Sequence, residues 1–270
     1  MVTQTEKALA FGALHARDRA FFIPNPWDLG SAAMFVKMGF EALATTSAGF
    51  AFTLGKRDGD VEREKMLAHA ATIAASTDLP VSADLENGYA DDPAAVFQTV
   101  RLAAEAGLAG CSIEDVPLGG HGGPYPIDFA AERVRAAAEA SRGLRFPFAL
   151  TARAENFLHD RPDLADTIAR LQAYQEAGAD VLYAPGLTRM EDIRSVVQSV
   201  DRPVNVLAFR GLHLNAAQLS AIGVKRISLG STLARTAYGA AFQACREMEQ
   251  HGTFSFMNDE RENPSLGGML

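Results

Sequence analysis

The amino-acid sequence predicts a closed (β/α)8 barrel formed by a single domain. Short apolar runs typical of buried strands alternate with helical stretches, and eight such runs precede residue 250. Several of the predicted helices end on a glycine, at Gly39, Gly107, Gly178 and Gly223, where a left-handed C-cap is expected. The competing architecture is a doubly wound sheet, which is disfavoured because no G-x-G-x-x-G follows the first run.

The predicted elements follow one another without a linker or a low-complexity segment. A surface helix over residues 3–19 comes first, and strands are predicted at residues 21–24, 42–46, 81–85, 110–113, 148–152, 181–184, 204–208 and 226–229. The predicted helix N-caps are Asp28, Asp92, Asn215 and Ser231. We expect the barrel to span residues 1–250, with residues 251–270 as a tail that is frayed or packs on a neighbouring subunit.

Composition and charge favour a cytoplasmic globular protein. The 270 residues are 48% hydrophobic and 21% charged, and the net charge of -8 without a basic tract argues against nucleic acid or an anionic membrane as the main partner. Two cysteines, Cys111 and Cys245, form neither a disulfide framework nor a Cys-x-x-Cys site, which favours a reducing compartment. We expect no signal peptide, because residues 1–19 have neither a long apolar core nor a cleavage-like signature. We expect no membrane span, because no apolar run reaches 18 residues.

A pair of acids at the end of the third predicted strand indicates a metal site. Ser82, Asp84 and Glu86 share one face by the two-residue period of a strand. Two carboxylates on one face repel each other unless a cation or a proton lies between them, and Mg2+ prefers such oxygen ligands. Glu114 ends the next strand in the same way. The alternative is that these acids only face water at the strand ends.

The predicted barrel places further polar residues around those acids, because active sites lie at the carboxyl ends of barrel strands. Arg153 follows the fifth strand and can bind a carboxylate or an oxyanion with its planar fork. Thr46 and Ser47 offer amides and hydroxyls to the same anion. A 2-oxo acid suits this site, since Mg2+ and Arg153 would stabilise its enolate. The alternative for Arg153 is a structural ion pair with Glu155 or Glu114.

Other candidate residues allow two interpretations each. Asp58 lies in a glycine-flanked loop that is either a lid or simply solvated. Trp27 lies in the site or in the core, and His121, within the run of glycines at 119–123, is a lid acid or has no role. Cys111 is expected to pack in the barrel wall, and the remaining histidines are expected on the surface or in helices.

Five segments of the sequence resemble the isocitrate lyase / phosphoenolpyruvate mutase superfamily. They read NPWD (residues 25–28), LGKRDG (54–59), ADLENGY (83–89), IED (113–115) and TARAE (151–155). They lie in order within a resemblance from about residue 21 to residue 237. The chain is more similar to the small mutase-like and 2-methylisocitrate-lyase-like members than to the large isocitrate lyases.

The resemblance implies a barrel whose last helix is swapped between the subunits of a homotetramer, built as a dimer of dimers. It also implies Mg2+, or sometimes Mn2+, held by Asp84 with help from Glu86 and Glu114, mostly through water. Glu86 stands where the superfamily more often has an aspartate.

The resemblance further implies that the metal, Arg153 and the amides near Thr46 and Ser47 bind a 2-oxo acid or its enolate. Trp27 is implied to lie against the substrate and Asp28 to help bind it. Asp58 is implied to lie in the gating loop after the second strand.

One loop departs from the superfamily's pattern. Residues 116–123 read VPLGGHGG, without the lysine and cysteine of the lyase branch or the lysine and asparagine of the mutase branch. We therefore expect an Mg2+-dependent carbon–carbon lyase or decarboxylase acting on a small 2-oxo acid or related dicarboxylate, with Asp58, His121 or a water handling protons. The first alternative is phosphonomutase-type carbon–phosphorus chemistry, for which only Arg153, Lys56 and Arg57 supply cations. The second is a non-catalytic barrel that binds a carboxylate.

Overall fold

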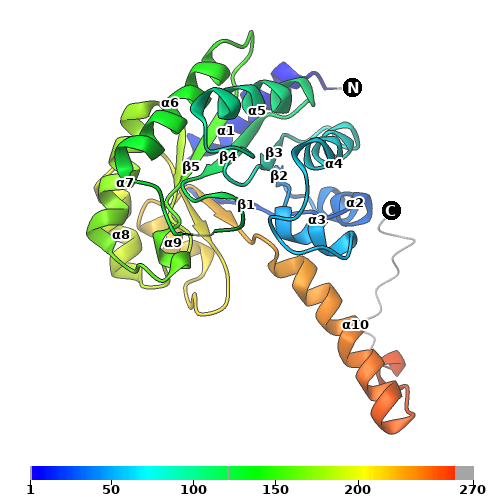
Figure 1. Cartoon of the computed structure of the whole chain (residues 1–270). Helices are drawn as coiled ribbons and strands as arrows, with labels where there is room; N and C mark the ends of the chain where they lie inside the picture. The colour runs from blue at the N-terminus through cyan, green and yellow to red at the C-terminus, as the bar shows by residue number, and fades with distance from the viewer. Residues whose placement is uncertain (1, 121, 259–270) are drawn as a thin grey trace.

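Eight parallel strands form a nearly closed barrel surrounded by helices in the computed structural model (Figure 1), which describes residues 2–120 and 122–258. The strands pair in the order β1-β8-β7-β6-β5-β4-β3-β2. They are β1 (Phe21–Ile23), β2 (Leu43–Ala44), β3 (Val81–Asp84), β4 (Gly110–Glu114), β5 (Ala149–Arg153), β6 (Val181–Tyr183), β7 (Val204–Leu207) and β8 (Arg226–Ser228). The predicted (β/α)8 barrel and all eight predicted strands are therefore confirmed, with ends that differ by two residues or fewer.

The polar side chain of Asn25 helps to close the barrel between β1, β2 and β8. Its amide donates to the Thr45 carbonyl at 3.1 Å and its oxygen accepts from the backbone of Leu229 and Gly230 at 2.9 Å each. One backbone bond, from Ala44 N to the Pro24 carbonyl, also joins β1 to β2. The loops at the carboxyl ends of the first and last strands are thereby held together.

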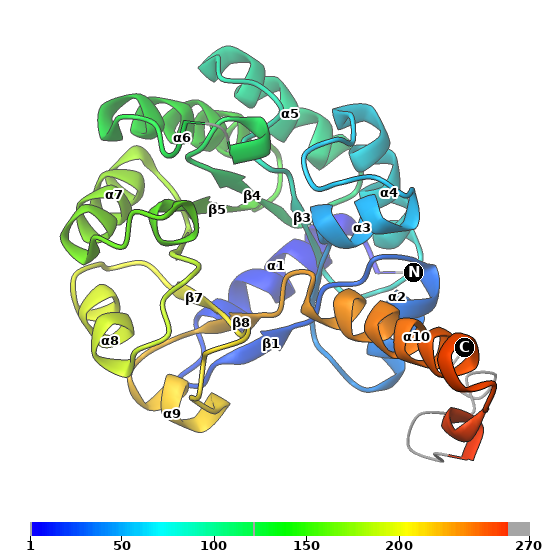
Figure 2. The same ribbon diagram turned by 60° about the horizontal axis from the view of Figure 1, so that its bottom comes forward.

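The strands are surrounded by helices, most of which cover the outward faces of the barrel (Figure 2). They are α1 (Gln4–His15), α2 (Leu29–Lys37), α3 (Ser47–Thr53), α4 (Arg63–Ala75), α5 (Pro93–Glu105), α6 (Ile127–Arg142), α7 (Leu164–Ala177), α8 (Met190–Gln198), α9 (Ala216–Ala221) and α10 (Thr232–His251), with short 3₁₀ turns η1 (Leu118–Gly120), η2 (Asn156–His159) and η3 (Ser255–Asn258). The main core lies between strands and helices, and Cys111 is fully buried in it, as expected.

Local signals in the sequence mark most of the helix ends. The four predicted C-cap glycines have φ between +84° and +110°, a conformation that glycine adopts without a steric penalty. Asp28, Asp92 and Asn215 cap their helices by accepting from backbone N–H groups. Ser231 is the N-cap residue of α10, as predicted, but its hydroxyl accepts from Arg235 Nε at 3.0 Å and makes no capping bond to the backbone.

The first helix closes the amino-terminal end of the barrel. Phe11 and Leu14 of α1 pack with Phe21, Ile23 and residues that precede β2 and β4. The predicted helix was therefore too long at its end, since α1 stops at His15, and its apolar side is a floor for the barrel rather than a surface face.

The last long helix lies apart from the barrel. Figure 1 shows α10 extending away from the strands, and only Ala234 of this helix is buried. Within the described residues no helix is long and apolar enough to cross a membrane.

Candidate active site

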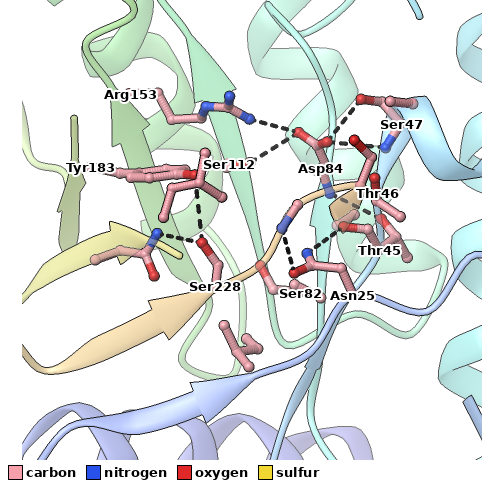
Figure 3. A pocket seen from close by; sticks show the side chains of 18 of the residues that line it. Asn25, Thr45, Thr46, Ser47, Ser82, Asp84, Ser112, Arg153, Tyr183 and Ser228 are labelled. Carbon is pink, nitrogen blue, oxygen red and sulfur yellow. Dashed lines mark hydrogen bonds and ion pairs between the residues drawn. The ribbon is translucent and has the colours of Figure 1, made fainter. Parts of the chain in front are cut away.

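A polar cavity of about 200 Å³ opens at the carboxyl ends of the strands (Figure 3). Residues from all eight strands or the loops that follow them line it; its polar lining includes Asn25, Thr45, Thr46, Ser47, Asp58, Ser82, Asp84, Ser112, Glu114, Arg153, Tyr183, Asn205, Arg226, Ser228 and Ser231. This is the end of the barrel at which the sequence predicted the active site.

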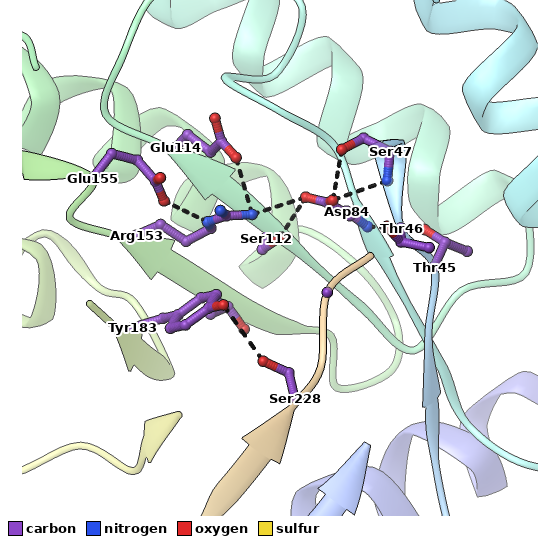
Figure 4. Close-up of polar contacts among 12 residues, drawn as sticks. Thr45, Thr46, Ser47, Asp84, Ser112, Glu114, Arg153, Glu155, Tyr183 and Ser228 are labelled. Carbon is purple, nitrogen blue, oxygen red and sulfur yellow. Dashed lines mark hydrogen bonds and ion pairs between the residues drawn. The ribbon is translucent and has the colours of Figure 1, made fainter. Parts of the chain in front are cut away.

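Asp84, the last residue of β3, is fixed by donors from neighbouring strands and loops. The backbone N–H and the hydroxyl of Ser47 donate to its Oδ2 at 3.0 and 2.8 Å. The hydroxyl of Ser112 donates to its Oδ1 at 3.4 Å, and its own N–H donates to the Thr45 hydroxyl at 3.0 Å. The carboxylate therefore projects into the cavity in one orientation (Figure 4).

Arg153 joins three of the acids at the end of β5 (Figure 4). Its Nη1 lies 3.0 Å from Asp84 Oδ1 and 2.9 Å from Glu114 Oε1, and its Nε donates to Glu155 Oε1 at 2.7 Å. Burial lowers the pKa of Arg153, but Glu114, Glu155 and Asp84 raise it well above its ordinary value. The structural pairing considered from the sequence is thus present. Nη2 has no hydrogen-bond partner among the described residues, so one edge of the guanidinium is open to an anion.

Carboxylates outnumber cations around Arg153, in this cavity and in the adjoining pocket that Glu86 lines. Burial raises the pKa of Glu86 to about 9, with further increases from Asp84 and Asp58. Burial also raises the pKa of Glu114 well above its usual value, although Arg153 opposes the shift. Asp58 is exposed at the mouth, where the surrounding protein and then the charge of Asp84 raise its pKa. A bound proton or a nearby cation reduces the repulsion between such carboxylates.

The donor set fits a hard divalent cation that keeps part of its water. Carboxylate oxygens of Asp84, Glu86 and Glu114 and the serine hydroxyls around them are the ligand atoms that Mg2+ prefers. Within residues 2–120 and 122–258, no three acids, histidines or cysteines converge closely enough to chelate an ion directly. Contact through water, which Mg2+ commonly retains, agrees with that spacing.

The loop after β3 is held in a conformation that side-chain-bearing residues rarely adopt. Glu86 and Tyr89 have φ of 51° and 63°, in the left-handed region. Such strain persists only where surrounding contacts enforce it, and it is concentrated at functional sites.

Comparisons with known proteins agree with this geometry. The sequence profile described as phosphoenolpyruvate phosphomutase matches residues 11–249. The chain belongs to the phosphoenolpyruvate phosphomutase family. This family lies within the isocitrate lyase / phosphoenolpyruvate mutase superfamily, so the predicted superfamily is confirmed.

Three relatives show the range of this family. A Burkholderia cenocepacia J2315 protein, provisionally assigned as a lyase or mutase, superposes with a TM-score of 0.94 at 52% identity over 98% of this chain and 96% of its own. The probable 2-methylisocitrate lyase 2 of Corynebacterium glutamicum is 30% identical over 93% of this chain and 83% of its own. The oxaloacetate decarboxylase of Chromohalobacter salexigens is 27% identical over 88% and 83%. The expectation of an enzyme with lyase relatives is confirmed.

In this phosphomutase-family chain, the buried arginine Arg133 of α6 holds the strained loop. Its guanidinium donates to the backbone carbonyls of Asn87, Ala90, Asp91 and Glu114. Arg133 was not among the residues predicted from the sequence. An arginine inside a predicted amphipathic helix resembles a surface residue, and no local signal distinguishes it.

Asp115 supports the family's acidic motif from the side away from the cavity. It accepts from the Glu155 N–H at 2.9 Å, from Arg170 Nη1 at 3.0 Å and from the Tyr174 hydroxyl at 2.5 Å, and it is buried. Because Glu155 in turn binds Arg153, Asp115 positions the arginine indirectly. Arg170 and Tyr174 lie on α7 and were also missed.

Several residues that were predicted to bind substrate make hydrogen bonds or ring contacts with other residues of the chain. Trp27 is outside the cavity lining and packs edge-on against Phe35 with ring centroids 6.3 Å apart. Asp28 caps α2 by accepting from Ser31 N–H at 2.7 Å. Both Ser47 donors bind Asp84, while the Thr46 hydroxyl accepts from Gly49 at 3.2 Å. Ser47 therefore orients the Asp84 carboxylate.

Two loops meet above the acids. Residues 47–53 form α3, so the loop that carries Asp58 starts near Leu54. A Cβ added at Gly59 would lie 3.1 Å from Gly119 Cα, which shows how closely the two loops approach. His121, considered as a lid acid, lies outside the described residues.

Proposed function

We propose that the chain is an Mg2+-dependent enzyme that cleaves a carbon–carbon bond of a small 2-oxo acid or related dicarboxylate through a stabilised enolate. The observation that carries this proposal is the convergence of Asp84 and Glu114 on Arg153 in one cavity, with Glu86 lining an adjoining pocket that shares Glu114 and Arg153. Relatives named as 2-methylisocitrate lyase and oxaloacetate decarboxylase support the reaction class.

Different residues of the site would bind the metal ion and the oxyanion. Asp84 would hold the cation, with help from Glu86 and Glu114, and Mg2+, or Mn2+ in its place, would supply Lewis-acid polarisation of the substrate. The open Nη2 of Arg153 binds the oxygen on which charge develops. Ser47, Glu155 and Asp115 keep Asp84 and Arg153 in position.

Proton transfer falls to residues at the cavity mouth. Asp58 lines the cavity and is exposed, and its raised pKa lets it hold a proton more readily than an ordinary aspartate. His121 or a bound water remains the other candidate donor. The two loops that meet at Gly59 and Gly119 would limit access of solvent to the enolate.

The alternative is carbon–phosphorus chemistry, which needs more positive charge. Lys56 is occupied by the Asp60 carbonyl at 2.9 Å and by Glu62 at 3.5 Å, and Arg57 is exposed. Of the two arginines that line the cavity, only Arg153 forms ion pairs with the acids among the described residues, and one guanidinium at this level favours a carboxylate over a phosphoryl group. A barrel that binds carboxylates without turnover is the remaining alternative.

Proton NMR of the purified protein with Mg2+ tests these alternatives. The panel is oxaloacetate, 2-methylisocitrate, 2,3-dimethylmalate, phosphonopyruvate and phosphoenolpyruvate, each also run with excess EDTA. We expect a 2-oxo acid from a carbon substrate, and a fall in turnover of about 10²–10³ in Arg153→Ala, since a lost oxyanion donor has effects of this order. Arg189→Ala, at an exposed ion pair at the start of α8, is the matched control and should retain activity.

The other outcomes are equally definite. Conversion of the phosphorus compounds alone would overturn the proposal in favour of a phosphonomutase. Binding of Mg2+ that is lost in Asp84→Ala, with no substrate converted, would favour the non-catalytic barrel.

A further inference from the structure

The cavity continues below the acids into the barrel. Interiors of (β/α)8 barrels are usually filled by bulky branched apolar side chains. Here Ser82, Ser112, Asn205 and Ser228 line the cavity, together with Arg226. Arg226 is the first residue of β8 and is only 5% exposed. A buried arginine normally has a carboxylate partner.

Arg226 is instead held by neutral acceptors. Its Nε donates to Asn205 Oδ1 at 2.9 Å and its Nη2 to the Thr151 hydroxyl at 3.0 Å. Its Nη1 lies 3.4 Å from His15 Nε2. In the part of the chain that the structure describes, it forms no ion pair. Since a guanidinium has five N–H donors, two of them remain for another acceptor.

The histidine below Arg226 does not neutralise its charge. His15 Nδ1 lies 2.8 Å from the Phe11 carbonyl, which can only accept, so Nδ1 carries the proton. Nε2 then has a lone pair that accepts from Arg226. Burial and the nearby Arg226 lower the pKa of His15 to about 3, which agrees with a neutral ring. The charge of Arg226 is therefore left uncompensated.

The position of Arg226 relative to Arg153 defines a second level in the cavity. Thr151, which binds Arg226, and Arg153 are two residues apart on β5, and therefore on the same face. Two residues of a parallel strand span about 6.6 Å. The guanidinium of Arg153 thus lies level with the acids, and that of Arg226 lies deeper in the barrel by about two residues along the strand.

We propose that Arg226, with Thr151 and Asn205, forms an anion-binding floor that receives the carboxylate of a dicarboxylate remote from the reacting carbon. This inference rests on the proposed function, in which the other carboxylate lies beside Arg153 and the metal. The two free N–H donors match a carboxylate, and binding it would supply the missing counter-charge. The floor would select dicarboxylates over monocarboxylates of equal length.

Binding of succinate and its monoamide succinamate tests this floor without requiring turnover. The ligands are of nearly equal size, and calorimetry with the Mg2+-loaded protein gives a dissociation constant for each. In the natural protein we expect succinate to bind at least about 10-fold more tightly. In Arg226→Gln the ratio should fall to about one, and Arg226→Lys should restore part of it.

Arg202→Gln is the matched control, because it removes the same charge from an exposed residue outside the barrel. Its ratio should equal that of the natural protein. An unchanged ratio in a folded Arg226→Gln would overturn the proposal, as would the lack of any succinate preference in the natural protein. The natural protein alone gives this second result, so the proposal can be overturned even if Arg226→Gln does not fold.

The outcomes separate this inference from the proposed function. Carbon–carbon turnover with an Arg226-independent ratio would refute the floor and leave the function standing. An Arg226-dependent ratio without turnover of any carbon substrate would support the floor and refute the function.

Discussion

At the scale of single residues, this site brings together side chains that lower the stability of the folded protein. Glu86 is 7% exposed, has a left-handed backbone and lies beside Asp84 and Asp58. Arg153 compensates only part of the negative charge. A cation would lower this electrostatic cost, so we interpret the acid cluster as built for binding rather than for stability.

Neutralising Glu86 should therefore stabilise the metal-free protein at high pH. A carboxyl whose pKa rises on folding, here to about 9, contributes stability below its unfolded pKa and loses it as pH rises toward the folded value. We expect Glu86→Gln to gain at least about 1 kcal/mol relative to the natural protein between about pH 5 and pH 8. Urea unfolding in EDTA at several pH values measures this difference.

Glu132→Gln, on the exposed side of α6, is the control and should show no such trend. A difference between Glu86→Gln and the natural protein that does not grow with pH would contradict the electrostatic explanation. Mg2+ should reduce the difference, because the ion stabilises the ionised acids.

At the scale of elements, the two loops over the site depend on glycine for their contact. Gly59 and Gly119 both have positive φ, of 82° and 77°, and their backbones meet without side chains between them. The position of Asp58 next to Gly59 links this contact to the cavity mouth. Loops that close over an active site commonly control substrate entry and product release.

Gly59→Ala should impair turnover more than Gly55→Ala. Both substitutions force alanine into a positive φ, so each should lower stability by about 1 kcal/mol. A Cβ at Gly55 meets nothing within 4 Å, whereas one at Gly59 meets Gly119. We expect a loss of kcat/KM on the order of 10-fold in Gly59→Ala alone.

Steady-state kinetics on the substrate found by NMR, with thermal unfolding of each variant, measures both effects. Equal kinetic losses in the two variants would show that the contact with Gly119 does not matter for turnover.

At the scale of the whole molecule, α10 and the residues after it expose several large apolar side chains. Tyr238, Phe242 and Met248 are 46%, 60% and 39% exposed, and Phe254 and Met257 beyond the helix are 57% and 67% exposed. Exposed apolar side chains in such numbers mark a surface for another chain. The exchange of this helix between subunits, implied by the superfamily resemblance, stays a prediction.

A charge at Phe242 should break the predicted tetramer. Phe242→Asp would place a carboxylate where an apolar contact with a partner is expected, and burying an unpaired charge is costly. We expect a smaller species in size-exclusion chromatography with light scattering. Ala240→Asp, an exposed residue about half a turn away on the same helix, is the control. A monomeric natural protein, or equal assembly of natural protein and Phe242→Asp, would refute the prediction.

The local pattern of the sequence by itself determined the barrel, most helix caps and the acids at the strand ends. Apolar runs, capping side chains and C-cap glycines act within a few residues of one another, so they can be recognised along the chain. Asp84, Glu114 and Arg153 could be placed together because carboxyl ends of parallel strands meet at one end of a barrel.

Only the tertiary structure revealed the arginines that support or extend this site. Arg133 binds the carbonyl of Asn87 across 46 positions of sequence, and Arg226 meets His15 across 211. Asp115 directly follows Glu114 in the sequence, yet its partners Arg170 and Tyr174 turn it away from the cavity. Such contacts depend on which faces of distant elements pack together, and no local pattern records that.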